Sequence, residues 1–187
     1  MLTRDLVLAA LFAAIIVVLG LLPPIMLGFI SVPITAQSLG VMLAGVVLGA
    51  KRGTIAVLLV LLLAAIGLPV LSGGRGGLGV FAAPTTGYLI GWVAAAFVTG
   101  FLSEKLVKRE QPGLVQGTGF FISALLGGVV VLYAFGVTYL ALVTGMGFVK
   151  AFLGSLAFIP GDALKALVAA LAGRAVMVGY PLLPQRA

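Results

Sequence analysis

The chain of 187 residues is 63% hydrophobic and only 8% charged, which indicates an integral membrane protein, because soluble domains average about 45 to 50% apolar and about 25% charged residues. The sequence contains neither cysteine nor histidine, which excludes disulfides, thiolate or imidazole metal sites, and catalysis by a cysteine or histidine. The formal net charge is +7, but the basic residues stand singly or in pairs between apolar runs, so the expected surroundings are a lipid bilayer and not nucleic acid.

Six apolar segments are long enough to cross a membrane, which takes about 20 residues within a range of about 17 to 25. They are residues 6–22, 34–50, 54–71, 84–103, 114–143 and 148–180. The first segment lacks a convincing small-residue cleavage site, so we interpret it as a retained helix and not as a signal peptide. Pro160 and Gly161 predict a break in the long sixth segment. The sequence therefore predicts an all-α integral membrane protein, with a single domain over residues 1–187 that is a bundle of six transmembrane helices.

The distribution of basic residues predicts how this bundle is oriented. If the helices alternate in direction, most of the cations lie on one face and only Arg75 and Lys150 lie on the other. The positive-inside rule then places both termini in the cytoplasm and Asp162 in the outer half of the membrane. The cations on the predicted cytoplasmic face are Arg4, Lys51, Arg52, Lys105, Lys108, Arg109 and Arg186.

Asp162 and Lys165 place an acid and a base inside a predicted membrane-spanning helix. A charge at bilayer depth costs from about 3 to more than about 10 kcal/mol, so such residues usually face a cavity, a partner or a substrate. Residues three apart share one face of a helix, and the two side chains can therefore bind a ligand through one acceptor and one donor. The alternative is a structural ion pair that joins two helices. We favour a ligand site, because a helix break often accompanies one.

A glycine-rich segment, residues 67–79, is predicted to form an outer loop. It lacks the Gly-Lys-Ser or Gly-Lys-Thr ending of a Walker A loop, so the chain is not expected to bind and hydrolyse ATP alone. Gly73, Gly74 and Gly77 can offer backbone amides to a ligand or form the hinges of a lid, and Arg75 adds a cation. The alternative interpretation is a flexible connector without a function.

Polar residues also occur at the outer end of the second segment. Thr35 and Gln37 bring hydrogen-bonding groups to the predicted level of Asp162, and Phe29 and Tyr88 are candidate apolar or stacking walls. Taken alone, Thr35 and Gln37 can equally be capping or interface residues. We interpret the other large aromatic residues as interfacial anchors or packing residues: Trp92, Tyr133, Tyr139 and Tyr180.

In their order and spacing, these motifs resemble those of the BioY family, the biotin-specific S components of energy-coupling factor (ECF) transporters. The resemblance covers nearly the whole chain. The matching motifs are Val32 Pro33 Ile34 Thr35 Ala36 Gln37, then Leu43 Ala44 Gly45 Val46 Val47 Leu48 Gly49, then Gly67 Leu68 Pro69 Val70 with Gly73 Gly74 Arg75 Gly76 Gly77, then Pro84 Thr85 Thr86 Gly87 Tyr88 Leu89 Ile90 Gly91, and finally Pro160 Gly161 Asp162 with Lys165. The family usually has Gly-Pro-Thr-Gly-Gly-Tyr where this chain has Ala83 Pro84 Thr85 Thr86 Gly87 Tyr88.

The resemblance implies a subunit that binds biotin from outside and releases it inward across the cytoplasmic membrane of a bacterium. The implied partners are a transmembrane coupling protein (T component) and paired ABC ATPases, which alone hydrolyse ATP; no enzymatic activity and no cofactor of its own are implied. Asp162 can accept a hydrogen bond from a ureido N–H of biotin, while Lys165 can donate to the ureido carbonyl or to the carboxylate. Arg75 is a candidate for the carboxylate tail, and the choice between the two cations stays open. Thr85 joins the candidate binding residues.

Small residues recur four apart on the first segment, at Ala9, Ala10, Ala13 and Ala14. In lipid, such residues usually allow helices to pack closely within one protein. The resemblance implies that they contact the coupling protein instead, so we expect a docking surface there, with internal packing as the alternative.

Two other classes of function compete with this interpretation. An S component for another vitamin shares the fold and differs in its pocket. A channel or proton-coupled carrier would use Asp162 as a relay, but the other acids, Asp5, Glu104 and Glu110, are all predicted to be cytoplasmic and form no path across the membrane. A membrane enzyme is disfavoured too, because one carboxylate and one lysine offer little acid–base machinery.

Overall fold

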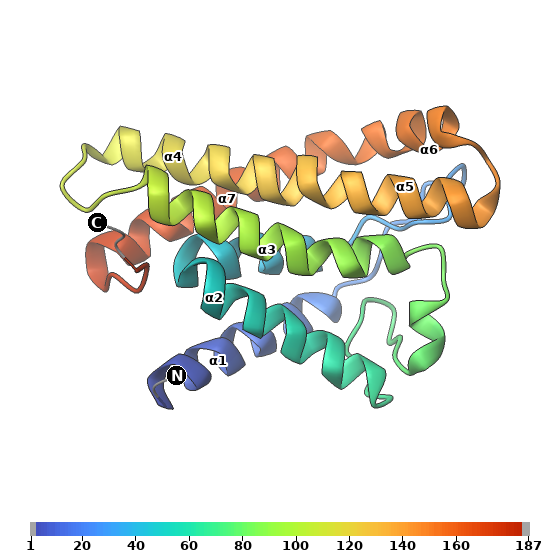
Figure 1. Ribbon diagram of the computed structural model, residues 1–187, viewed down its shortest axis with the longest axis horizontal. Coiled ribbons are helices and arrows are strands. Elements are labelled where there is room, and N and C mark those ends of the chain that lie inside the picture. Colours follow the sequence, from blue (N-terminus) through green and yellow to red (C-terminus); the bar gives the residue numbers. More distant parts are fainter. Residues whose placement is uncertain (1–2, 185–187) are drawn as a thin grey trace.

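The computed structural model describes residues 3–184, and the regular structure of this part of the chain is helical (Figure 1). Five helical runs in it are long and apolar enough to cross a membrane. The helices are α1 (Thr3–Gly20), α2 (Gln37–Ala65), α3 (Thr86–Leu106), α4 (Gly113–Leu125), α5 (Leu132–Thr144), α6 (Phe148–Ser155) and α7 (Ile159–Gly179), with short 3-10 turns at Leu78–Phe81 and Leu156–Phe158 and a π-helical turn at Leu126–Val131.

The second and third predicted segments form the two arms of α2, which bends sharply at Gly49. Gly49 has φ 82° and ψ −179°, a conformation that only glycine adopts without strain. Close to the bend, a Cβ atom placed on Gly53 would lie 2.7 Å from the carbonyl oxygen of Ala44. The amide of Gln37, at the start of the first arm, bonds to the carbonyl of Val70, beyond the end of the second arm. Since a straight helix of this length would separate its ends by about 40 Å, the second arm must fold back along the first.

Buried polar contacts hold this bend. The backbone N–H of Ala50, which begins the second arm, donates a 2.8 Å hydrogen bond to the carboxylate of Glu104 at the end of α3. A carboxylate at the N-terminus of a helix satisfies a free amide and lies at the positive end of the helix dipole. Nearby, Arg52 bonds to Asp5 of α1 at 2.8 Å and to the carbonyl of Leu182 at 2.9 Å. The bend therefore joins α1, α3 and the segment that follows α7.

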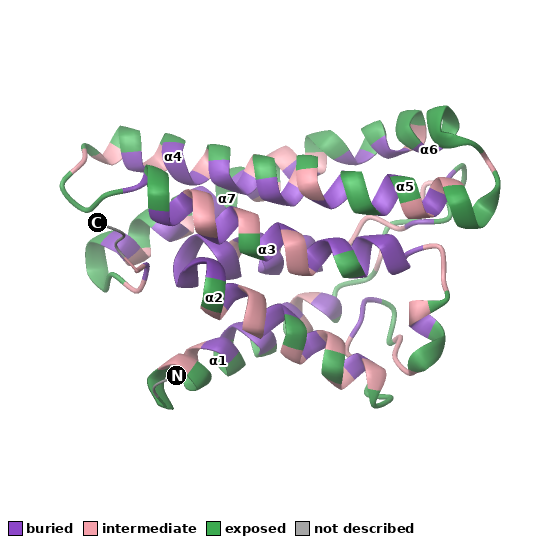
Figure 2. Cartoon of the chain, in the orientation of Figure 1, coloured by how far each residue is buried: buried purple, intermediate pink, exposed green. Residues whose placement is uncertain are grey.

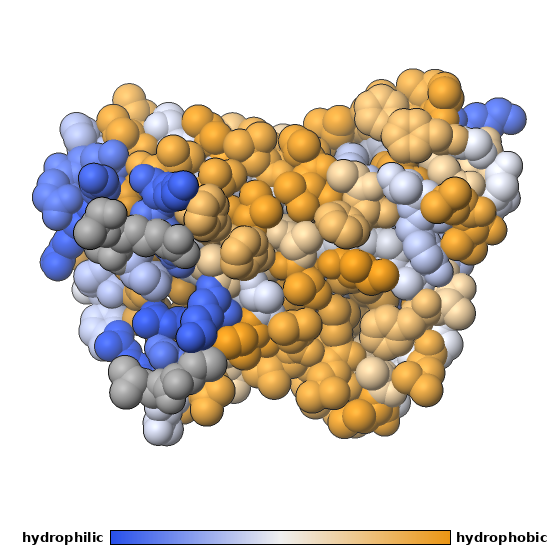
Figure 3. Space-filling model, in the orientation of Figure 1, coloured by the Kyte–Doolittle hydropathy of each residue, from blue (hydrophilic) through white to orange (hydrophobic). Residues whose placement is uncertain are grey.

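The bend and the ends of the described chain lie at one end of the molecule, on the left of Figure 1. Figure 3 shows that this end is hydrophilic, whereas a broad apolar surface covers the middle of the bundle. Buried residues concentrate on α2 and α3, at the centre of the bundle, while α1 and α6 present much exposed surface (Figure 2). This pattern is the one expected of a bundle surrounded by lipid.

The last two predicted segments are both interrupted. α4 and α5 form one run through the π-helical turn, where a Cβ atom on Gly128 would overlap the side chain of Met42. α6 and α7 are separated by the 3-10 turn Leu156–Phe158, just before Pro160. Proline has no N–H to donate to the carbonyl four residues earlier, and its ring clashes with that group. The predicted break in the sixth segment is thus confirmed, slightly before the proline itself.

Two loops occupy the end of the molecule opposite to the Gly49 bend. The loop between α1 and α2 is folded on itself by the paired backbones of Ile25 and Ile34, with N···O distances of 3.0 and 2.9 Å. The loop after α2 contains a tight hairpin in which Leu71 pairs with Arg75. Both loops border the cavity described next.

Candidate functional site

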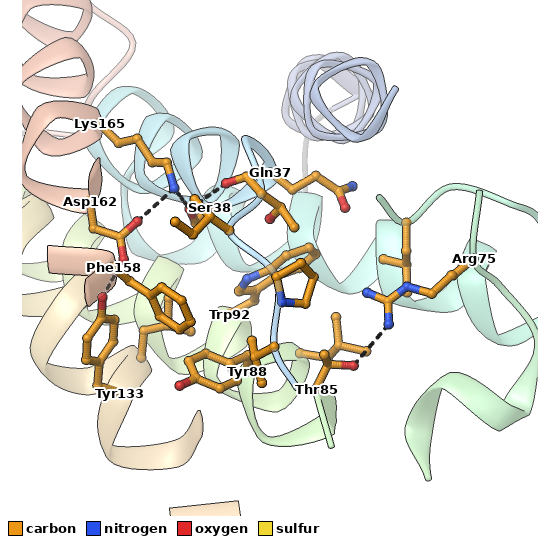
Figure 4. Close-up of a pocket in the computed structure, with 17 residues that line it drawn as sticks. Gln37, Ser38, Arg75, Thr85, Tyr88, Trp92, Tyr133, Phe158, Asp162 and Lys165 are labelled. Carbon is orange, nitrogen blue, oxygen red and sulfur yellow. Dashed lines mark hydrogen bonds and ion pairs between the residues drawn. The ribbon is translucent and has the colours of Figure 1, made fainter. Parts of the chain in front are cut away.

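A cavity of about 600 Å³, including its opening, lies between these loops and the helices α2, α3, α5 and α7. Polar groups gather at its two ends, and apolar and aromatic side chains form the walls between them (Figure 4). The cavity can therefore hold a small molecule with a polar group at each end.

Asp162 and Lys165 form the first polar end. Because both lie on α7, one turn apart, their side chains meet, and Lys165 Nζ lies 2.8 Å from Asp162 Oδ1. Lys165 also donates to Ser38 Oγ at 2.9 Å, and the hydroxyl of Tyr133 donates to Asp162 Oδ2 at 2.7 Å. An ammonium group has three N–H donors, so Lys165 keeps one for a ligand. Asp162 is only 5% exposed and lies in the first turn of α7.

Arg75 forms the second polar end, across the cavity from Asp162 and Lys165 (Figure 4). Its Nε donates to the carbonyl of Ser72 at 3.1 Å, and one terminal nitrogen donates to Thr85 Oγ1 at 3.4 Å. No acidic residue in the described part of the chain forms an ion pair with Arg75. A guanidinium group carries five N–H donors, so this cation remains available to an anion.

Aromatic rings separate the two ends. Tyr88 and Tyr133 lie edge to face with their centroids 6.4 Å apart, and Tyr133 meets Phe158 in the same way at 6.5 Å. The hydroxyl of Ser155 donates to the carbonyl of Ala151, so the hydroxyl of Tyr88, 3.0 Å from Ser155 Oγ, is the donor of that pair. These walls, with Trp92, offer an apolar ring system a stacking surface.

The structure brings most of the predicted site residues to this cavity. The predicted residues that line it are Thr35, Gln37, Arg75, Thr85, Tyr88, Asp162 and Lys165. Phe29 does not: its side chain is 64% exposed and lies outside the cavity lining, so its prediction as a wall is wrong. The backbone bridge between Ile25 and Ile34 closes the loop that joins α1 to α2. As a result, residues 32–35 of this loop face the cavity, and the tip of the loop, which carries Phe29, does not.

The predicted role of the glycines is corrected as well. Gly73, Gly74 and Gly77 are absent from the lining of the cavity. Gly73 and Gly74 have φ values of 79° and 69°, which allow the chain to reverse between Leu71 and Arg75. Gly73 and Gly74 therefore form the turn that presents Arg75 to the cavity and are not themselves part of its lining.

Several lining residues were not predicted. Ser38 is the polar neighbour of Gln37 in the sequence. Trp92 lies one helical turn after Tyr88, so helical spacing could have identified it. Phe158 likewise lies one helical turn before Asp162, whereas the sequence gives no comparable signal for Tyr133. Trp92 and Tyr133, interpreted as anchors or packing residues, are buried in the cavity wall.

The four alanines of α1 divide into two pairs. Ala9 and Ala13 are buried inside the chain, at 0% and 4% exposure, whereas Ala10 and Ala14 are exposed. Because a residue covered by its own chain has no surface left for a partner, the predicted docking surface is reduced to Ala10 and Ala14. Of the predicted cytoplasmic cations, Arg186 lies outside the described residues.

Comparisons with known proteins agree with the motifs and with the fold. The model of the BioY family matches residues 1–181. The biotin transporter BioY of Rhizobium etli is 76% identical over 185 residues, which cover 99% of both chains, and that of Rhodobacter capsulatus is 52% identical over 92% of this chain and 93% of the relative. A crystal structure at 2.1 Å of the S-component for biotin from an ECF-type ABC transporter has a TM-score of 0.90 at 37% identity, over 97% of each chain. With the family model, full-length relatives and a solved structure in agreement, the chain belongs to the BioY family.

Proposed function

We propose that the chain binds biotin in this cavity from the outer face of the membrane and delivers it inward as the substrate-capture subunit of an ECF-type ABC transporter. The observation that carries the proposal is the charge distribution along the cavity, with the Asp162–Lys165 pair at one end and Arg75 at the other. The names of the relatives from Rhizobium etli and Rhodobacter capsulatus, both biotin transporters, support the same substrate.

Biotin has a polarity that matches this cavity. Its ureido group carries two N–H donors and a carbonyl acceptor, its sulfur ring is apolar, and its valerate tail ends in a carboxylate. Lys165 is already neutralised by Asp162, whereas Arg75 has no acidic partner among the described residues. We therefore assign the carboxylate to Arg75, a ureido N–H to Asp162, and the ureido carbonyl to the remaining N–H of Lys165. The aromatic walls take the sulfur ring.

Calorimetric titration of the purified chain in detergent tests the substrate and its orientation. We expect saturable binding of biotin, and binding of biotin methyl ester that is weaker by about tenfold or more, because the neutral ester loses its charge-assisted contact with Arg75. Titrations with thiamine and riboflavin serve as controls. Binding of another vitamin without binding of biotin would overturn the substrate, and equal affinities for biotin and its ester would overturn the assignment to Arg75.

We also propose that the two arms of α2 cross the membrane separately, which gives six crossings and places both termini in the cytoplasm. The cations Arg4, Lys51 and Arg52 support this orientation, since Arg52 bonds to Asp5 of α1 and to Leu182 after α7. The native chain contains no cysteine, so single cysteines can report topology. Lys150→Cys should react with a membrane-impermeant maleimide in intact cells, and Lys108→Cys only after permeabilisation; the reverse pattern would contradict the orientation.

The proposed partners are a T component and paired ABC ATPases. The described chain has no Walker A motif to hydrolyse ATP itself, and the related solved structure comes from a transporter of this type. Inward delivery of biotin should therefore require the ATPases, and uptake that follows a proton gradient in their absence would favour a carrier instead.

A further inference from the structure

Gln37 lines the cavity, yet its amide is fully engaged with the protein backbone. Its Nε2 donates to the carbonyl of Ile16 in α1 at 3.1 Å and to that of Val70 at 3.0 Å, while its Oε1 accepts from the N–H of Ser72 at 2.7 Å. Both donors of the amide are thus used, and the side chain is 1% exposed. A residue in this state is not a donor for a ligand, so its place beside the cavity needs another explanation.

The contacts of Ser72 provide one. Its N–H is bound by Gln37, and its carbonyl accepts the hydrogen bond from Arg75 Nε at 3.1 Å. A continuous series of hydrogen bonds therefore runs from Gln37 through the backbone of Ser72 to the guanidinium group of Arg75. Because two adjacent glycines form the turn that follows Ser72, the hairpin has little stiffness of its own, and fixing Ser72 fixes the direction of Arg75.

The space around the amide supports a specific role. A Cβ atom placed on Gly20, at the end of α1, would lie 2.7 Å from Gln37 Nε2 and 2.9 Å from the carbonyl of Val70. Gly20 thus leaves room for the amide to reach Ile16 and Val70 at the same time. A larger residue at position 20 would push apart the groups that Gln37 joins.

We propose that Gln37 is a positioning residue, which acts on the ligand through Arg75 by holding the Leu71–Arg75 hairpin between α1 and α2. This inference rests on the proposed function, since it assumes that Arg75 binds the carboxylate of biotin. It predicts that removal of the Gln37 amide weakens the binding of a carboxylate ligand without removing any direct contact to it.

Gln37→Met tests the inference, because methionine keeps the length of the side chain and removes the amide. Gln116→Met is the matched control: Gln116 is also a buried amide, 5% exposed, which donates to two carbonyls, those of Lys108 and Arg109, far along the chain from the cavity. We expect Gln37→Met to raise the Kd for biotin about tenfold, and Gln116→Met to leave it within about twofold.

A double-mutant cycle with Arg75→Ala separates positioning from a general loss of structure. If Gln37 acts through Arg75, Gln37→Met in the Arg75→Ala background should raise the Kd by less than about twofold, since coupled residues are not additive. Biotin methyl ester should also lose little affinity on Gln37→Met in the otherwise native chain. Additive effects, or equal losses for biotin and its ester, would overturn the inference.

Two further measurements keep the test decisive. Hydrogen exchange of residues 70–77 should accelerate in Gln37→Met, and unchanged exchange with unchanged Kd would overturn the inference. If Gln37→Met does not fold, the Gly20→Ala variant takes its place in the same double-mutant cycle. The Cβ added at position 20 displaces the Gln37 amide without removing it. Failure of the native chain to bind biotin would count against the proposed function, whereas binding by the native chain that Gln37→Met leaves intact would count against this inference alone.

Discussion

The hydroxyl of Tyr133 donates a 2.7 Å hydrogen bond to Oδ2 of Asp162, the oxygen that Lys165 leaves free. Tyr133 comes from α5, whereas Asp162 and Lys165 come from α7. The carboxylate is therefore oriented by side chains on two helices. The rotation of the Asp162 side chain is restricted before a ligand binds, which lowers the entropic cost of binding.

Tyr133→Phe removes this hydrogen bond and keeps the ring. We expect the Kd for biotin to rise about tenfold, because a hydrogen bond to a charged group contributes about 1.5 to 3 kcal/mol. Tyr139→Phe, on the same helix but outside the cavity lining, is the control and should change the Kd by less than about twofold. Equal Kd values for the two variants in calorimetric titration would show that the Tyr133 hydroxyl does not orient the acid.

Asp162→Asn keeps the shape of the side chain and an oxygen that Lys165 can still approach. We expect biotin to bind about 30-fold or more weakly, because a neutral amide is a weaker acceptor for the ureido N–H than a carboxylate. The midpoint of thermal unfolding in detergent should fall by no more than about 3 °C. A large loss of stability that accounts for the loss of binding would mean that Asp162 and Lys165 form a structural pair.

The two faces of α1 should respond differently to a bulky residue. Ala14→Trp adds a ring to an exposed position and should leave biotin binding intact in detergent, while it disrupts co-purification with the coupling protein and uptake of biotin in cells. Ala13→Trp is the comparison, because Ala13 is 4% exposed and an indole there overpacks the contact of α1 with the rest of the bundle. If Ala14→Trp loses fold and binding together, the docking surface on α1 is contradicted.

Gly49→Ala should destabilise the bend of α2. A side chain at φ 82° and ψ −179° is strained by about 1 to 3 kcal/mol, and the added Cβ would also overlap the carboxylate of Glu104. We expect the unfolding midpoint to fall by about 4 °C or more. Gly117→Ala, in α4, meets no atom within 4 Å and should be neutral or slightly stabilising. A neutral Gly49→Ala would contradict the strain argument.

The sequence predicted the apolar helices, the break near Pro160 and the residues at both polar ends of the cavity, because these depend on hydropathy, on proline and on charges in an apolar setting. It did not predict the contribution of Tyr133, which reaches Asp162 from α5 although α7 packs mainly against α2 and α4. The roles of Gln37 and of the glycines were misjudged for a related reason. A buried amide and a ligand-binding amide look the same in a sequence, and only the positions of distant carbonyls distinguish them.

The two buried acids of the described chain, Glu104 and Asp162, differ in how permanent their partners are. Glu104 accepts a hydrogen bond from the backbone of Ala50, a group that cannot leave without unwinding a helix, whereas Asp162 is held by the side chains of Lys165 and Tyr133, which can rotate away. Rearrangement therefore costs less at the cavity, where side chains rotate, than at the Gly49 bend, where a helix must unwind. If biotin exchanges hydrogen bonds with Asp162 as proposed, the cavity can rearrange around it while the bend at the other end of the bundle keeps its structure.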